Sequence, residues 1–266
     1  MLFWITLPLP LHRRGATLAA GWFRTPKKAF SRRFQYIMLL FDVLTLFPGI
    51  FESFLSESVL KNALDRNLFS IRFHNIRDWA GDKHNTVDDR PFGGGPGMVL
   101  KVDCVVPCVE QVLATQSESG RLISLTPQGK PLTQPLVEEL AKERRIVLLC
   151  GRYEGFDERI AQILTPEEIS IGDYILNGGE VAAMAVIEAV MRLIPGVLGD
   201  EESNRDDSFS RSNRLLEFPQ YTRPREYRGL EVPEILLSGN HGEIAKYREE
   251  QSRLQTLNKR PELLVR

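Results

Sequence analysis

Four glycine-bearing segments contain the residues best suited to hold a small ligand. They are GGGPG (93–97), LTPQG (125–129), GRYEG (151–155) and IGDYILNGGE (171–180). Glycine lets the backbone turn sharply and approach a ligand, so that N–H and C=O groups make the contacts. Neither GxGxxG nor GxxxxGK[ST] occurs in the sequence, so nucleotide binding through those motifs loses its main support. Taken alone, GGGPG is explained equally well as a surface loop.

Three charged side chains have spacings that allow either a chemical or an ordinary structural role. Arg192 follows Glu188 by four residues, an arrangement that forms a common ion pair on a helix. Asp206 and Asp207 lie in a polar segment, where aspartates are usually solvated or cap the next helix. From the residues alone, the structural interpretation is favoured for all of them.

The cysteines indicate neither a disulfide framework nor a zinc site. The chain has three of them, Cys104, Cys108 and Cys150, which is an odd number without a CxxC pair. A reducing cytoplasm is therefore the expected compartment. No compact cluster of carboxylates indicates another metal site, so no metal ligands are predicted.

The hydrophobic pattern predicts strands that end close to these loops. Buried strands are predicted over Leu39–Phe47, Ile71–Ile76, Leu122–Thr126 and Ile146–Cys150, with a helix starting at Pro48 and another over Leu132–Arg144. Strands that alternate with helices predict an α/β fold with a mostly parallel sheet covered on both faces. Because such sheets bind ligands beyond the carboxyl ends of their strands, the loops starting at 125, 151 and 171 are expected to build one pocket.

The second half of the chain changes character after one apolar helix. Val181–Ile194 is apolar on nearly every face, which is typical of a buried helix that often packs against a partner subunit. A polar stretch follows, and Ile244, Tyr247 and Leu254 then recur at helical spacing among basic residues, which predicts a small helical domain. The expected divisions are a leader (1–37), a ligand-binding domain (38–198), a flexible linker (199–206) and a helical C-terminal domain (207–266).

Charge is distributed unevenly along the chain, although the formal net charge is only -1. Residues 1–37 contain seven Lys or Arg and no acidic residue, and residues 211–266 contain eleven basic and eight acidic residues. A basic tail on an acidic body suits a protein that touches a polyanion through one part. The leader is interpreted as an upstream or disordered extension rather than a signal peptide, because Pro8 and Pro10 break its apolar start. No stretch approaches the roughly 20 apolar residues of a membrane span.

Nine strings identify a family resemblance: LTLFPGIF, TVDDRPFGGGPGM, LTPQG, GRYEGFDER, SIGDYILNGGE, RLIPGVLG, DDSF, YTRP and KRPELL. In order and spacing they resemble the tRNA (guanine-37-N1)-methyltransferases, the TrmD family, from Leu39 to about Leu264. The leader has no counterpart, which favours Met38 as the natural start. Thr126, Ala182 and Gln220 stand where the family commonly has Ser, Pro and His.

The resemblance implies a SPOUT methyltransferase, whose sheet contains a deep trefoil knot, and a homodimer whose active sites are shared between chains. It implies S-adenosyl-L-methionine as cofactor and tRNA as substrate, with Mg²⁺ as a possible additional requirement. By position, the residues expected to bind the cofactor are Leu125, Thr126, Pro127, Gly151, Tyr153, Ile171, Gly172, Tyr174, Leu176, Gly178 and Gly179.

The resemblance also nominates catalytic residues for methyl transfer to N1 of the guanine beside the anticodon. That reaction removes the N1 proton and gathers charge on O6, so it needs a base and a hydrogen-bond donor. Asp207 is the implied base and Arg192 the implied O6 partner, with Glu154 close to the site.

Two other functions remain open at this point. A dehydrogenase on an unknotted doubly wound sheet would need a dinucleotide motif, which the sequence lacks. An RNA-binding protein without catalytic activity would use only the basic tail, and it would bind tRNA without incorporating methyl groups.

Overall fold

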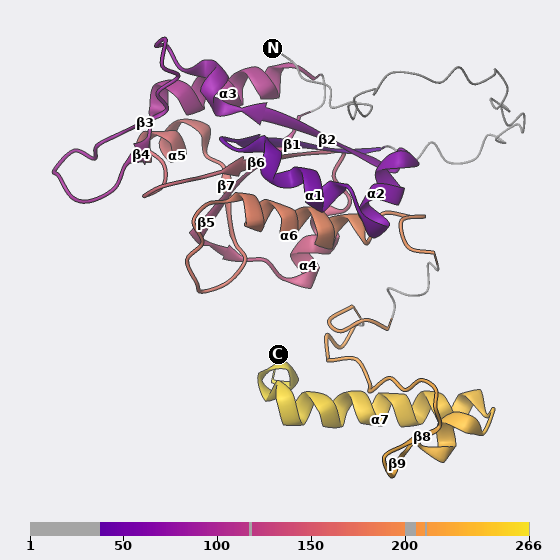
Figure 1. Ribbon diagram of the computed structural model, residues 1–266. Coiled ribbons are helices and arrows are strands. Elements are labelled where there is room, and N and C mark those ends of the chain that lie inside the picture. The colour runs from indigo at the N-terminus through magenta and orange to yellow at the C-terminus, as the bar shows by residue number, and fades with distance from the viewer. Residues whose placement is uncertain (1–37, 117–118, 200–205, 211, 266) are drawn as a thin grey trace, which may run out of the picture.

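The computed structural model describes residues 38–116, 119–199, 206–210 and 212–265. The leader 1–37 and residues 200–205 of the predicted linker lie outside the described residues. Figure 1 shows a central sheet between two groups of helices, followed by a C-terminal segment that ends in a long helix.

The central sheet has five strands, all parallel, in the order β2-β1-β6-β5-β7. Their bounds are β1 Leu39–Thr45, β2 Phe69–Asn75, β5 Arg121–Pro131, β6 Arg145–Cys150 and β7 Glu167–Ser170. The four predicted strands correspond to β1, β2, β5 and β6, so the mostly parallel α/β fold is confirmed.

Helices cover both faces of the sheet. Helix α3 (Val102–Ala114) packs with α5 (Glu158–Leu164) on one face. The other face carries α1 (Glu52–Leu55), α2 (Ser58–Asp65), α4 (Gln134–Leu140) and α6 (Glu180–Met191). Figure 1 shows α3 above the sheet and α4 and α6 below it.

The two faces bury separate hydrophobic clusters, because side chains alternate along each strand. In β6, Ile146 and Leu148 face the cluster under α4 and α6, whereas Val147 and Leu149 face the cluster under α3. All six residues of β6 are buried. Two-sided burial explains why the central strands are continuous apolar runs in the sequence.

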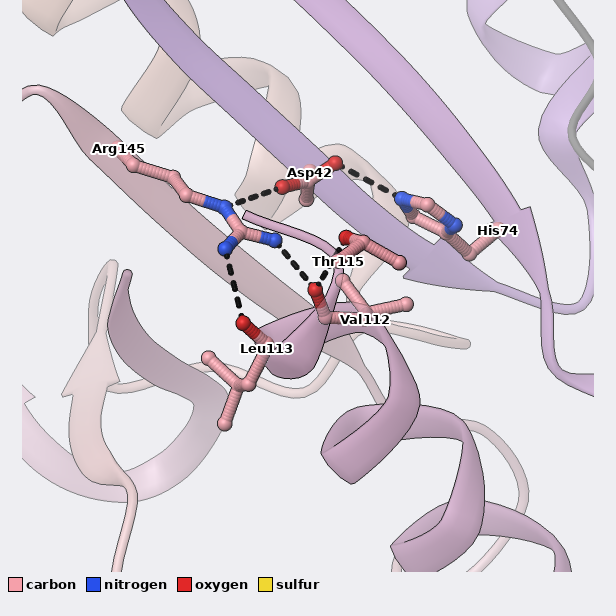
Figure 2. A network of polar contacts seen from close by, with 6 residues as sticks. All are labelled: Asp42, His74, Val112, Leu113, Thr115 and Arg145. Carbon is pink, nitrogen blue, oxygen red and sulfur yellow. Dashed lines mark hydrogen bonds and ion pairs between the residues drawn. The ribbon is translucent and has the colours of Figure 1, made fainter. Parts of the chain in front are cut away.

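A buried polar network joins the sheet to the end of α3 (Figure 2). Asp42 of β1 accepts hydrogen bonds from Arg145 Nε (2.7 Å) and His74 Nε2 (2.8 Å). The same guanidinium donates to Val112 O (2.6 Å) and Leu113 O (3.2 Å) at the last turn of α3. Arg145 therefore satisfies carbonyl groups that a helix end leaves without partners.

Two elements correct the sequence-based predictions. Helix α3 was not predicted, because Pro107 lies inside it and proline normally interrupts helices. The segment LTPQG was expected as a loop after a strand but lies within β5, at a register shift between Leu125 and Lys130. Gly129 permits this course, because a Cβ there would lie 2.3 Å from Ile169 N of β7.

The remaining described elements are short, apart from the last helix. They are η1 Pro48–Phe51, η2 Ile76–Trp79, β3 Asp88–Asp89, β4 Val99–Leu100, β8 Glu226–Tyr227, β9 Leu230–Glu231, η3 Glu234–Leu237, α7 His241–Lys259 and η4 Pro261–Leu264. The extended chain near Leu216 packs on α7, where Thr256 Oγ1 accepts from Leu216 N (3.0 Å) and Ser252 Oγ donates to Leu216 O (2.5 Å). Within the described ranges, no helix is both long enough and apolar enough to cross a bilayer.

Candidate active site

A cavity of about 450 Å³ lies at the carboxyl ends of β6 and β7 and beside the register shift in β5. All eleven residues predicted to bind a cofactor line it, from Leu125–Pro127, Gly151 and Tyr153 to Ile171–Gly179. Glu154, one of the three candidate catalytic residues, lines it as well. The three loops that were expected to build one pocket therefore meet at one cavity.

Glycines let backbone segments approach one another closely around this cavity. A Cβ at Gly179 would lie 2.8 Å from Cys150 Cα, and one at Gly172, whose φ is +151°, would lie 2.4 Å from the Tyr174 ring. Side chains at these positions would displace the walls of the cavity. At these two positions the wall is consequently formed by main-chain groups and by the ring of Tyr174.

The chain after β7 returns to the end of β6. Gly179 N donates to Gly151 O (2.8 Å), and Arg152 forms an isolated bridge with Gly178. Since β5 lies between β6 and β7 in the sheet, the segment 171–179 crosses the end of β5 to make these contacts. The crossing brings the second and third loops together as two sides of one cavity.

The glycine-rich segment 93–97 ends against the same site. Glu154 N donates to Met98 O (2.9 Å), and a Cβ at Gly97 would lie 2.2 Å from Glu154 Oε1. In contrast, a Cβ at Gly93, Gly94 or Gly95 would meet no atom within 4 Å. The end of the segment is therefore part of the site, and its other glycines form an open turn.

An ion pair with a buried carboxylate lies at the cavity wall. Arg152 Nε donates to Glu180 Oε2 (2.9 Å), and Thr45 Oγ1 donates to Glu180 Oε1 (2.8 Å). The guanidinium also lies over the ring of Phe47, with its carbon 4.7 Å from the centroid. Sequence reasoning missed this pair, because 28 residues separate its members and no local spacing connects them.

The cavity carries an excess of negative charge. Its lining includes four acidic residues, Glu154, Asp157, Glu158 and Glu168, and one basic residue, Arg152, which is paired with Glu180. Hydrogen bonds from Arg159 hold the pKa of Asp157 below its usual range, so this carboxylate stays ionised. Such a lining suits a small ligand with a positive charge better than a phosphate-rich one.

Cys150, at the end of β6, is not a candidate nucleophile. Its side chain is fully buried, and burial raises the pKa of the thiol well above its ordinary value. Because only a thiolate attacks efficiently, this thiol stays inert. The residues around the cavity therefore offer hydrogen bonding and carboxylate chemistry rather than covalent catalysis by cysteine.

Arg192 and Asp207 meet each other but do not line the cavity of their own chain. Arg192 Nη2 donates to Asp207 Oδ2 (2.7 Å), and both side chains are partly exposed. This contact replaces the ordinary Glu188–Arg192 pair that the spacing favours. Arg192 follows the last residue of α6, so the position of the pair depends on that helix.

No metal site is found in the part of the chain that the structure describes, where no three His, Cys, Asp or Glu side chains converge closely enough to hold an ion.

Comparisons with known proteins place these features in a family. The family model described as tRNA (Guanine-1)-methyltransferase TrmD matches residues 39–266. A tRNA (guanine-N(1)-)-methyltransferase of Rhodopirellula baltica is 61% identical over 225 residues, which cover 84% of this chain and 93% of that protein. Proteins of the same name from Geobacillus kaustophilus and Citrifermentans bemidjiense are 56% and 54% identical, over 84% of this chain and 90% and 89% of theirs. The match runs from Leu39, the first residue of β1, to Arg266, and this chain belongs to the TrmD family of tRNA (guanine-1)-methyltransferases.

Proposed function

We propose that this tRNA (guanine-N1)-methyltransferase uses S-adenosyl-L-methionine to methylate the guanosine at position 37 of tRNA, next to the anticodon. The observation that carries the proposal is the convergence of all eleven expected cofactor residues on one acidic cavity. When bound, the cofactor supplies an electrophilic methyl group on a positively charged sulfur.

The cavity fits such a cofactor in shape and in charge. Its glycines bring main-chain groups close to the bound molecule, and its acidic residues favour a cation. A nicotinamide dinucleotide carries two negative phosphates, and the Arg152 guanidinium, which is paired with Glu180, is the single basic group in the lining. The charge balance therefore favours the methyl donor over a dinucleotide.

Arg192 and Asp207 match the edge of guanine that reacts. Guanine presents an N1–H donor beside its O6 acceptor, and a carboxylate next to a guanidinium presents the complementary groups. We assign removal of the N1 proton to Asp207 and hydrogen bonding to O6 to Arg192. Because a carboxylate is a weak base, the proton leaves as the methyl group arrives rather than beforehand.

A homodimer with shared active sites is part of the proposal. The Arg192–Asp207 pair lies outside the cavity lining of its own chain, so a second chain could bring it to the cavity. Apolar side chains beside the cavity are exposed, including Ile175 (81% exposed) and Val181 at the start of α6. Exposed apolar groups of this kind are typical of a surface that a partner covers.

A trefoil knot is also proposed, and the crossing of residues 171–179 over the end of β5 supports it. The chain leaves β7, the edge strand, and passes its neighbour β5 before it reaches the end of β6. Here it returns to Gly151.

We assign contact with the body of the tRNA to the C-terminal segment. A second cavity there, also about 450 Å³, is lined by Arg223, Arg225 and Arg248 together with Phe218 and Tyr221, and by no acidic residue. Arg248 lies over the Phe218 ring, 4.6 Å from its centroid. Guanidinium and aromatic groups together bind phosphates and bases of RNA. Gln220, which departs from the family pattern, lines the same cavity.

A reducing, cytoplasmic compartment completes the proposal, because all three cysteines are buried as free thiols.

Two measurements test this function. Calorimetry should detect binding of S-adenosyl-L-methionine and none of NAD. Mass spectrometry of nuclease-digested tRNA, after incubation with the enzyme and cofactor, should locate 1-methylguanosine at position 37. Binding of tRNA without any methyl incorporation would instead identify a protein that only binds RNA.

A further inference from the structure

The Arg152–Glu180 pair lies directly against the cavity wall. A Cβ at Gly178, which lines the cavity, would lie 2.3 Å from Arg152 Nε and 2.6 Å from Glu180 Oε2. The two opposite charges therefore occupy the space that a side chain at residue 178 would need, next to the cavity lining.

The carboxylate of this pair is held away from solvent. Glu180 is 1% exposed and Thr45, which donates to it, is completely buried. Arg152 is partly exposed and belongs to the cavity lining. Burying a carboxylate in this way is costly unless it is paired. Glu180 is paired with Arg152 and Thr45, so its charge is held in place beside the cavity.

The electrostatic effect of Glu180 depends on the charge of the ligand. Without Glu180, the Arg152 guanidinium would face the cavity as an uncompensated positive charge. A cationic ligand would then be repelled, whereas a neutral ligand of the same shape would not be. We propose that Glu180 determines ligand specificity by neutralising Arg152, so that the cavity accepts a positively charged sulfonium. This inference rests on the proposed cofactor.

S-Adenosyl-L-methionine and S-adenosylhomocysteine provide the matched probes. The first has a sulfonium, the second a neutral thioether, and they are otherwise alike except for the methyl group. Glu180→Gln keeps the size and much of the hydrogen bonding of the side chain but removes its charge. Calorimetry on the full-length protein should show the Kd for the sulfonium compound rising at least about tenfold more than the Kd for the thioether.

Two further variants separate charge from structure. Arg152→Gln/Glu180→Gln removes both charges, so the ratio of the two Kd values should return to that of the unmodified protein even if both affinities fall. Arg152→Gln alone, measured near pH 8.5, should lower the Kd for the sulfonium compound relative to the Kd for the thioether. If Glu180→Gln does not fold, Arg152→Gln decides the question by itself.

A purely structural role for Glu180 predicts a different result. Loss of loop geometry would weaken binding of both compounds by the same factor. An unchanged ratio of the two Kd values in Glu180→Gln or Arg152→Gln therefore overturns the proposal. If the unmodified protein binds neither compound, the proposed cofactor itself is wrong. The two failures are therefore distinguishable.

Discussion

The proposed methyl transfer assigns roles to three side chains, and single substitutions can separate these roles. Glu154 lines the cavity, whereas Asp207 and Arg192 form a pair outside it. None of these roles follows from sequence spacing, because Glu188 is the partner that helical geometry would give to Arg192. Family resemblance nominated both Asp207 and Arg192, and the structure places Arg192 Nη2 2.7 Å from Asp207 Oδ2.

Asp207→Asn should lower the rate of methyl transfer at least ~100-fold while cofactor and tRNA binding survive, because the variant loses its proton acceptor but keeps its shape. Higher pH should partly restore the rate, since guanine then loses its proton to solvent. Single-turnover rates with saturating tRNA and cofactor measure the effect, with Asp206→Asn as the neighbouring control. A normal rate in Asp207→Asn would move the role of base to Glu154.

Arg192→Lys should also be slow, but for another reason. A lysine keeps the positive charge and loses the planar fork of donors that can hold O6 and Asp207 together. Its pH–rate profile should therefore show less recovery at high pH than that of Asp207→Asn. Equal recovery in both variants would show that the arginine acts on the proton rather than on O6.

At the scale of elements, the central strands were predictable and the irregular parts were not. Strands buried on both faces are continuous apolar runs, so β1 and β6 are evident in the sequence. Helix α3 was obscured by Pro107, whereas a strand before Ile171 was expected and only its bounds, which begin at two glutamates, were not given by the pattern. The three-loop cavity was predictable from parallel topology, whereas the Arg152–Glu180 pair depends on a crossing that no local pattern encodes.

The Asp42 network makes a testable contribution to stability. Asp42→Asn leaves the buried Arg145 without its counter-charge and should cost ~3–5 kcal/mol of unfolding free energy. Asp65→Asn is the control, because its pair with Lys61 is exposed and contributes under about 1 kcal/mol. Denaturant titration of the three proteins measures both values, and equal losses would contradict the assigned role.

The same network predicts a pH dependence. Burial opposes ionisation of Asp42, but hydrogen bonds from His74 and Arg145 outweigh it and lower the pKa of the carboxyl. The folded pKa is thus below the unfolded value of about 3.9, so the stabilisation is complete above that pH and is lost as pH falls further. The stability gap between the unmodified protein and Asp42→Asn should narrow under acid conditions. If the difference in stability instead widens as the pH falls, the pKa of Asp42 is not lowered in the folded protein.

For the whole molecule, the main question is whether one chain can complete an active site alone. A chain with Asp207→Asn and a chain whose cavity wall is displaced by Gly178→Leu should each be inactive, because a side chain at Gly178 would collide with Arg152 and Glu180. If the sites are shared between chains, mixing and reassembly should restore activity, because mixed dimers pair an intact cavity with an intact Asp207. With equal amounts of the two chains and random pairing, half of the dimers are mixed and each has one intact site, so about a quarter of all sites should be active. No recovery, despite mixed dimers in native mass spectrometry, would place each site within one chain.

The C-terminal cavity predicts how salt affects RNA binding. Arg223→Ala should weaken tRNA binding and reduce the slope of log K against log salt by about 1, as expected for one lost phosphate contact. Cofactor affinity should stay unchanged, because the two cavities share no residue. Arg228→Ala, outside the cavity lining, is the matched control. Equal effects of the two variants on tRNA binding would contradict RNA contact at this cavity.

The return of the chain from β7 to Gly151 also dictates an order of events during folding. Residues 171–179 can take their place only after β5 and β6 are already side by side, because they cross the end of β5 to reach β6. Helix α6 follows that crossing in the chain, so we expect it to dock on this face after the crossing is made. Steps that join distant segments are slow. Refolding should therefore recover helical circular dichroism first and the capacity to bind ligand measurably later, and newly made chains should become competent only after α6 has left the ribosome.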